Sequence, residues 1–372
     1  MATPEQLQEI RDECGKDLIL FGMTITPKTF YLKTPPFHYE IAEHLMDRGK
    51  TQVSIMAPRG FAKSSLSVLF ILHHILYDEG NKVIVIQSKT QPEAINRLTQ
   101  IKNIFNYSRE FQELYGFAGK EVSLQWTDKK IRTKLVKDGE VKCSITIKAI
   151  GTGMPARGML ESDEELETWR ITLYFLDDAD DEDNTVTPDQ MLKNWDKFAG
   201  SKEGLDKRNG RVLVLGTFIR DGCIVDRLDD AIGWFTKKYE ARWDDEEGHH
   251  LLWEEMRDEK WLDDKLAEYT DQDTPWKYWA EFHNKNTNAA DRLFKGWKYW
   301  DGDLVFKEDY AYLKITKLGS DKNNMVELDP PKTVAVNNFV GIDPASSEKQ
   351  TADKSVTFPI SYSSDRDIYT HQ

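Results

Sequence analysis

The sequence predicts an α/β fold in which a mostly parallel sheet carries helices on its faces, with a small helical lid beside it. Strand-like and helical segments alternate: Gln52–Met56 precedes an apolar helical run that ends at Leu76, and Lys82–Gln87 precedes Gln91–Phe105. A phosphate-binding loop lies between the first strand and its helix. A later apolar strand ends in paired acids. These observations are typical of a P-loop nucleotide hydrolase.

Composition limits the alternatives. At 372 residues, with 39% hydrophobic and 31% charged residues, the chain can bury one large core and a smaller unit. A net charge of −14 argues against a surface covered in nucleic-acid contacts, but a local basic groove stays open. Two basic clusters are candidates for such a groove, or are solvated turns and strand edges: Lys129, Lys130, Arg132 and Lys134, and Lys207, Arg208 and Arg211.

Targeting signals and metal-ligand patterns are not evident. The three cysteines, Cys14, Cys143 and Cys223, are scattered without metal-ligand spacing, which favours a reducing cytoplasmic setting. Neither a basic region leading into an apolar stretch nor a membrane-length apolar segment occurs. We expect a protein that is neither secreted nor inserted in a membrane.

The loop at residues 57–65 fits a degenerate phosphate-binding motif. Its residues are Ala57, Pro58, Arg59, Gly60, Phe61, Ala62, Lys63, Ser64 and Ser65. In the standard motif, backbone amides hold phosphates, the lysine reaches the β- and γ-phosphates, and the hydroxyl binds Mg²⁺. Lys63 and Ser64 match, whereas Ala57 and Ala62 replace glycines. Ala62 suits the loop only if its φ stays below zero. The alternative is an ordinary strand-to-helix loop.

The strand Ile171–Leu176 runs directly into Asp177 and Asp178. In P-loop hydrolases the first acid at such a strand end orients Mg²⁺ and the next polarises the attacking water. Asp178 is shorter than the usual glutamate, so Asp180 or Glu182 is an alternative base. The acidic run at 180–183 also fits a solvated loop.

Further elements follow. We expect antiparallel strands at 121–126, 131–136 and 141–150 with a turn at Asp138-Gly139, a helix at 187–200, a strand at 211–217, a Trp-rich helical segment at 251–300 and strands at 338–342, 355–361 and 367–369. The predicted domains are a core at 1–245, a lid at 246–327, a linker at 328–337 and the start of a second domain at 338–372.

In order, these motifs resemble those of the large terminase subunit of tailed bacteriophages, the motor that packages DNA. The matching segments are Pro36-Phe37-His38, residues 57–65, residues 151–158, Asp177-Asp178, Leu215-Gly216-Thr217 and residues 341–345. The resemblance implies an ASCE-type P-loop ATPase followed by the truncated start of an RNase H-like nuclease.

The resemblance also implies roles for individual residues. Phe37 and His38 would contact adenine, and Arg59 would offset charge on the transferring phosphate. Arg157 would be an arginine finger acting on a neighbouring subunit's nucleotide. Thr217 would couple hydrolysis to movement. Without the resemblance, Phe37 and His38 are interpreted as core packing, Arg157 as part of a surface ion pair and Thr217 as a strand cap.

Asp343 matches the first metal-binding acid of the nuclease. Because the later acids have no counterpart in this chain, we expect no DNA cleavage from it. The cofactors implied are ATP and Mg²⁺. The partners implied are double-stranded DNA, the portal protein, the small terminase subunit and further copies in a ring, although an isolated chain could be monomeric. The expected location is the host cytoplasm, at the procapsid.

Two other functions stay open. One is a helicase-like ATPase stimulated by DNA. The other is a binding module in which the degenerate loop holds nucleotide without turnover.

Overall fold

The computed structural model describes residues 3–154, 156, 161–162, 168–287, 299–307, 310–319, 325–343, 356–363 and 368–370. The chain divides into two compact units, Met1–Asn288 and Ala289–Gln372. Each unit has its own sheet, and each is described by itself below.

The first unit is built on an eight-stranded sheet with the order β10-β1-β9-β8-β2-β5-β4-β3. The first six of these strands are parallel, and β4 and β3 extend the sheet through antiparallel pairing. The strands are β1 Gln52–Met56, β2 Lys82–Ser88, β3 Ser123–Trp126, β4 Lys130–Lys137, β5 Glu140–Gly151, β8 Leu173–Asp177, β9 Arg211–Gly216 and β10 Phe235–Lys238. The predicted mostly parallel α/β fold is confirmed.

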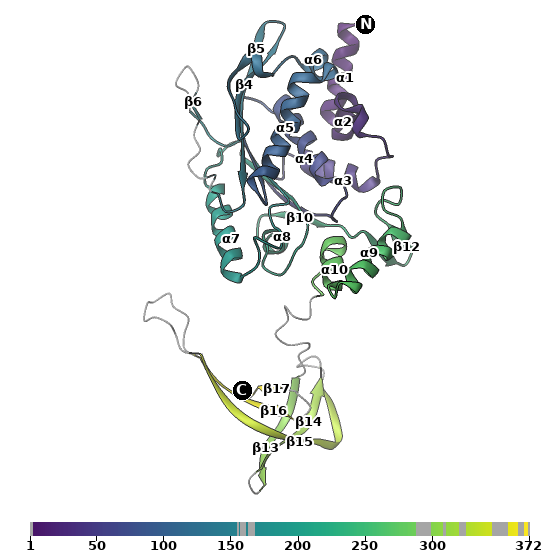
Figure 1. The fold of residues 1–372 in the computed structure, drawn as a ribbon, viewed down its shortest axis with the longest axis vertical. Coiled ribbons are helices and arrows are strands. Elements are labelled where there is room, and N and C mark those ends of the chain that lie inside the picture. Colours follow the sequence, from purple (N-terminus) through teal and green to yellow (C-terminus); the bar gives the residue numbers. More distant parts are fainter. Residues whose placement is uncertain are drawn as a thin grey trace. The chain divides into compact units, whose positions relative to one another are not determined.

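Helices cover both faces of this sheet (Figure 1). One face packs against α1 Pro4–Lys16, α2 Leu18–Ile25, α3 Pro36–Met46, α4 Lys63–Tyr77, α5 Gln91–Tyr107 and α6 Arg109–Tyr115. The other face packs against α7 Pro188–Lys202 and α8 Ile224–Asp229. A two-stranded ribbon, β6 Glu161–Ser162 with β7 Thr168–Trp169, precedes β8.

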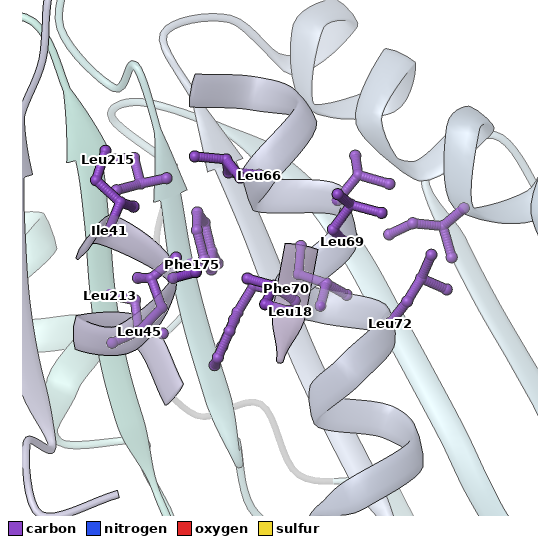
Figure 2. Packing of buried hydrophobic residues seen from close by; sticks show 14 of the residues in the cluster. Leu18, Ile41, Leu45, Leu66, Leu69, Phe70, Leu72, Phe175, Leu213 and Leu215 are labelled. Atoms are coloured by element: carbon purple, nitrogen blue, oxygen red, sulfur yellow. The ribbon is translucent and has the colours of Figure 1, made fainter. Parts of the chain in front are cut away.

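The central strands are apolar throughout because both faces are covered. On β8, Leu173 and Phe175 belong to the cluster beneath α4, whereas Tyr174 and Leu176 belong to the cluster beneath α7 and α8. Side chains alternate between faces along a strand, so a strand buried on both sides needs no polar positions. Figure 2 shows Phe175 among the leucines of α4 and of β9.

The predicted antiparallel hairpin forms next to the edge strand β3. Its strands β4 and β5 meet at Asp138 and Gly139, whose φ angles are +54° and +80°. Two consecutive positive φ angles are the requirement of the type I′ hairpin turn, which aspartate followed by glycine satisfies. The hairpin also joins the parallel part of the sheet, because β5 pairs with β2 on its other side.

Two helices follow the large sheet. They are α9 Glu259–Asp271 and α10 Pro275–His283, preceded by the ribbon of β11 Arg242–Asp245 and β12 Gly248–Leu251. Trp261 of α9 meets Phe282 of α10 edge to face, with ring centroids 5.5 Å apart. This pair belongs to the first unit, whose boundary at 288 differs from the domain limits of 245 and 327 expected from the sequence.

The second unit contains an antiparallel sheet with the order β13-β14-β15-β16-β17. Its strands are β13 Tyr299–Lys307, β14 Tyr310–Gly319, β15 Val326–Asp343, β16 Val356–Ser363 and β17 Ile368–Thr370. The segment 328–337, expected as a linker, lies within β15. Pro330 and Pro331 fall where the register with β14 jumps, between the pair Ile315 and Lys332 and the pair Lys317 and Glu327. Prolines cannot donate to a ladder, so a bulge accommodates them without ending the strand.

Among the described residues, no helix combines the length and the apolar character needed to cross a bilayer.

Candidate functional site

The loop between β1 and α4 turns sharply at two residues with positive φ. Gly60 has a φ of +78° and Ala62 a φ of +60°. The condition set from the sequence, that Ala62 keeps φ below zero, is therefore not met. Ala62 takes the left-handed conformation at the N-cap of α4, where its methyl group costs about 1–2 kcal/mol that glycine would avoid. The surrounding contacts hold the loop in this strained shape.

Lys63 folds back under the loop and is buried. Its Nζ donates to the carbonyl oxygens of Ala57 and Pro58, both at 3.0 Å, and to Thr217 Oγ1 at 2.7 Å. Asp178 Oδ1 lies 3.7 Å from the same nitrogen. A buried ammonium group is costly unless it is paired and hydrogen-bonded, and these four oxygens meet that requirement.

The N-terminus of α4 presents unused backbone donors. Within the part of the chain that the structure describes, the amides of residues 60–64 donate no hydrogen bond, and no side chain caps the helix. Such amides, together with the helix dipole, form a binding site for phosphate. The position of Lys63 at the start of α4 adds a positive charge beside them.

Asp177 ends β8 and is fully buried. Its Oδ1 accepts from Ser67 Oγ at 2.9 Å, and its Oδ2 accepts from Arg97 Nε at 2.6 Å. The Arg97 guanidinium also donates through Nη2 to Ser64 Oγ at 2.8 Å. Burial and the adjacent Asp178 carboxylate raise the pKa of Asp177, whereas Arg97 and Ser67 oppose that rise.

Asp178 stands between the loop and the strand β9. Its φ is +46°, a conformation that aspartate tolerates better than most residues. Its Oδ1 lies 3.3 Å from the hydroxyl of Thr217, which follows β9. The structure therefore brings Lys63, Asp178 and Thr217 into one cluster at the carboxyl edge of the parallel sheet.

The acidic run after Asp178 is not uniformly solvated. Asp180 is buried and accepts a hydrogen bond from the backbone N–H of Ile224. Burial raises the pKa of Asp180 to about 7. Glu182 forms an exposed ion pair with Lys277 of α10 at 2.7 Å. The solvated-loop interpretation is thus wrong for Asp180, whose carboxyl group is held against α8.

Arg59 connects the loop to α10. Its Nη1 contacts Glu281 Oε1 at 2.5 Å, and its backbone N–H donates to the Glu281 carbonyl oxygen at 2.9 Å. Tyr269 of α9 donates to the other carboxylate oxygen of Glu281 at 2.8 Å. The Glu281 side chain is only 9% exposed, so the Arg59 charge neutralises a carboxylate that water scarcely reaches.

Two cavities flank this cluster, and Asp178 lines both. One, of about 380 Å³, is lined mostly by charged groups, which include Arg59, Arg97, Asp178, Asp180 and Glu281, and also by Thr217. The other, of about 390 Å³, is lined by the start of α4 and by mostly apolar side chains, which include Phe30, Tyr31, Leu32, Leu69, Trp253 and Met256. The amides and the ammonium group at the start of α4, next to these aromatic side chains, suit a ligand with an anionic part and an aromatic part.

Phe37 and His38 differ in their relation to these cavities. Phe37 packs in the core beside Phe61 and Tyr239 and lines neither cavity. His38 lines the apolar cavity and donates from Nε2 to the carbonyl oxygen of Phe61 at 3.0 Å. Burial lowers the pKa of His38 to about 4, so its ring is neutral at pH 7.

Three other sequence predictions have limited support in the structure. Arg157 lies outside the described residues, and of Asp343 only the backbone, at the end of β15, is described. Of the second basic cluster, Lys207 and Arg208 are exposed, whereas Arg211 is buried and donates to the carbonyl oxygens of Asp47 and Lys50. Lys130, Arg132 and Lys134 all have interaction partners.

Arg97, Ser67 and Glu281 belong to the site but were not predicted from the sequence. Arg97 and Ser67 lie inside helices, each next to apolar residues, and neither belongs to a motif. Their helical positions become informative only when the sheet order places β8 between β2 and β9. The one signal for Glu281 was an acid between Ala280 and Phe282 in a helix rich in aromatic residues.

We predict that Ala62→Gly stabilises the protein. Relief of the left-handed strain stabilises the protein by about 1–2 kcal/mol, whereas the greater freedom of glycine in the unfolded chain destabilises it by about 0.5–1 kcal/mol. The free energy of unfolding should therefore rise by about 0.5–1 kcal/mol, measured by urea denaturation. Ala42→Gly, inside α3, should instead lose about 1 kcal/mol or more. Destabilisation by both variants would contradict a strained Ala62.

We predict that acidification lowers the free energy of unfolding of the wild-type protein more than that of a His38→Gln variant. His38 titrates near pH 4 when folded and near 6.5 when unfolded, so the unfolded state binds more protons between these values. The stability advantage of neutral His38 is thus present above pH 6.5 and is lost as pH falls towards 4. Glutamine keeps a donor for the Phe61 carbonyl oxygen. Denaturation from pH 4 to 7 should show the two proteins diverging on acidification; parallel curves would contradict the burial effect.

No model of a known protein family matches the sequence, and no curated protein matches it. Similar solved structures include a mutant ATPase domain of the Thermus phage P74-26 large terminase, which is 10% identical with a TM-score of 0.47, covering 70% of this chain and 97% of that one. The HK97 bacteriophage large terminase is 15% identical with a TM-score of 0.48, covering 94% and 68%. The large terminase of a thermophilic bacteriophage, in complex with ADP, is 6% identical with a TM-score of 0.40, covering 72% and 60%. Large terminases of bacteriophages, which the sequence motifs resemble, are thus among the solved structures similar to this chain.

Proposed function

We propose that this protein hydrolyses ATP at the loop between β1 and α4. The observation that carries the proposal is the convergence of three groups at the carboxyl edge of one parallel sheet. These groups are the amides at the start of α4, which have no partner among the described residues, the buried Lys63 and the acids Asp177 and Asp178. Phosphate-binding donors beside a carboxylate pair are what phosphoryl transfer to water requires.

Binding divides between the two cavities. The aromatic and aliphatic lining around Trp253 and Tyr31 suits the flat, apolar faces of a nucleobase. His38, neutral and aimed at the loop, closes the side of this cavity without adding charge. The triphosphate would then lie along the amides of residues 60–64, with Lys63 exchanging backbone carbonyl oxygens for phosphate oxygens.

Ser64 and Asp177 have the chemistry expected of magnesium ligands. Both supply oxygen atoms, which Mg²⁺ prefers, and a single guanidinium reaches both of them in the structure. Bound there with the nucleotide, Mg²⁺ would neutralise charge on the β- and γ-phosphates. Ser67 holds the second oxygen of Asp177 and so fixes the orientation of the carboxylate.

Asp178 is our candidate for the group that orients and deprotonates the attacking water. It lines both cavities, stands 3.7 Å from Lys63 Nζ and is about one-third exposed, so water reaches it. Asp180 is the alternative base, since its pKa of about 7 suits proton transfer at neutral pH. Against that role, the hydrogen bond from Ile224 directs one Asp180 oxygen to the backbone.

We further propose that hydrolysis drives double-stranded DNA into a procapsid. Support comes from the order of the motifs along the sequence, which resembles that of large terminases. In this proposal Arg157 serves a neighbouring subunit's nucleotide, Thr217 links the loop to β9, and the partners are DNA, the portal protein and the small terminase subunit. A helicase-like ATPase and a nucleotide-binding module without turnover are the alternatives. The RNase H-like assignment of residues 338–372 is likewise a proposal.

We predict that phosphate release from Mg²⁺-ATP depends on Lys63 and on protein concentration. Lys63→Ala should abolish release, because the variant lacks the ammonium group that the loop's carbonyl oxygens hold in place and that would bind the phosphate oxygens. If Arg157 acts between subunits, the rate per molecule should rise with protein concentration. Lys102→Ala, on α5 and away from both cavities, is the matched control and should keep the wild-type rate.

The measurement is phosphate release over a concentration series, with and without double-stranded DNA. Release equal to that of the Lys63→Ala protein under all conditions would reduce the proposal to nucleotide binding. A constant rate per molecule would leave ATPase activity in place but would remove the role of Arg157 between subunits.

We predict that Asp178→Asn and Asp180→Asn separate the two candidate bases. Asp178→Asn should retain ADP binding and lower the hydrolysis rate by about 100-fold or more, the usual size of a general-base effect. Asp180→Asn should hydrolyse ATP at a near wild-type rate, because its amide oxygen can still accept from Ile224. Single-turnover hydrolysis and equilibrium ADP binding are the measurements. The reverse ranking would assign the base to Asp180.

A further inference from the structure

Arg97 lies at the centre of three elements that the proposed reaction brings together. It extends from α5, and its guanidinium donates to Asp177 at the end of β8 and to Ser64 in the first turn of α4. The two contacts are 2.6 Å and 2.8 Å long. They use two nitrogens of one planar group, so the guanidinium bridges the hydroxyl and the carboxylate.

These two oxygen-bearing groups are the magnesium ligands of the proposed function, on which this inference rests. A magnesium ion binds oxygen at about 2.0–2.1 Å and keeps an octahedral shell of further ligands around it. The guanidinium already donates to both groups across the space between them. A second cation placed between Ser64 and Asp177 would clash with the Arg97 guanidinium and would be repelled by its positive charge. Arg97 and Mg²⁺ therefore compete for one position.

We propose that Arg97 is a resident cation which holds the magnesium position in the nucleotide-free protein, so that Mg²⁺ enters together with the nucleotide and not alone. The burial of Asp177 explains the need for such a cation. Its side chain is 1% exposed and adjoins Asp178. A buried carboxylate without a partner is strongly destabilising. Ser67 satisfies one of its oxygens as a neutral donor, which leaves Arg97 as the charge that balances it.

When Arg97 is displaced from Asp177, its guanidinium can bind the phosphates of the nucleotide nearby. Its side chain is 22% exposed and lines the charged cavity together with Arg59 and Thr217. Phosphate oxygens lying along the amides of residues 60–64, next to Ser64, would accept the two guanidinium donors in place of Ser64 and Asp177. The exchange keeps Asp177 paired with a cation throughout. Metal binding then depends on the phosphates, because they bind the Arg97 guanidinium that the metal displaces.

Metal binding without nucleotide tests this exchange directly. Mn²⁺ alone serves as the probe, with free Mn²⁺ measured by electron paramagnetic resonance, and ADP binding is measured separately by calorimetry at fixed Mg²⁺. Arg97→Gln should bind Mn²⁺ at least about tenfold more tightly than the wild type, because removal of one adjacent charge shifts carboxylate equilibria by that factor or more. The same variant should bind Mg²⁺-ADP several-fold more weakly, since the phosphates lose a donor.

Opposite signs for the two ligands distinguish the exchange from a merely structural ion pair. Lys102→Gln, on the same helix with its Nζ near the Thr127 carbonyl oxygen, is the matched control and should change neither affinity. If Arg97→Gln does not fold, Arg97→Lys supplies the test. It retains the charge but not the two-pronged contact, so its Mn²⁺ affinity should rise, though by less than about tenfold, and its Mg²⁺-ADP affinity should fall.

An unchanged or weaker Mn²⁺ affinity in a folded Arg97 variant would overturn the proposal. That result is distinguishable from failure of the ATPase itself. If the wild type binds Mg²⁺-ADP, the nucleotide site stands and only the role of Arg97 is lost. If the wild type binds no Mg²⁺-ADP and Lys63→Ala matches it, the proposed function fails as well.

Discussion

The burial of opposite charges at one edge of the parallel sheet is the constraint on which the site depends. Lys63 and Asp177 are both almost inaccessible to water, and each must be matched by partners because isolated buried charges are costly. Lys63 is matched largely by carbonyl oxygens of its own loop, which draws the loop into a tight curve around the ammonium group. Asp177 is matched by Ser67 and Arg97, which ties α4 and α5 to the end of β8. The shape of the site is therefore set by charges that a nucleotide would have to redistribute.

The same requirement links the loop to the helical pair α9 and α10. Glu281 is nearly buried, and its carboxylate is shared between Arg59 of the loop and Tyr269 of α9. A phosphate that attracted Arg59 would leave Glu281 with a neutral donor in place of a cation. Asn284, at the C-cap of α10 and close to Glu281, anchors this end of the helix, because its side chain bonds the backbone of Phe218 and of Tyr239. Helix α10 is thus attached to the loop at one point and to the segments after β9 and β10 at others.

Local sequence patterns predicted many of the helices, strands and turns, whereas the order of the strands depends on long-range pairing. The alternation of β1, α4, β2 and α5, and the Asp138-Gly139 turn, follow from periodicity and turn chemistry within short segments. The contacts of Arg97 depend on β8 lying next to β2, and strand order cannot be read from such segments. The resemblance implied that Phe37 contacts adenine, but Phe37 packs in the core, which was the alternative interpretation; a motif position does not reveal which side of a helix faces the loop. Pro330 and Pro331 suggested a linker, but a bulge in β15 accommodates both.

The division of the site into two cavities follows from the same charge distribution. Carboxylates and guanidinium groups gather beyond the carboxyl ends of β8 and β9, where the loops that carry them converge. Aromatic side chains from the segment before α3 and from the segment after β12 gather on the other side of the loop. Lys63 and Asp178 lie at the boundary. Residues at the start of α4 also line this apolar side, so a purely apolar ligand there would offer their amides no acceptor, and an inorganic phosphate alone would leave the aromatic lining exposed to water. Only a molecule with both an aromatic ring and a chain of phosphates uses the two sides together, which is the physical reason for preferring a nucleotide.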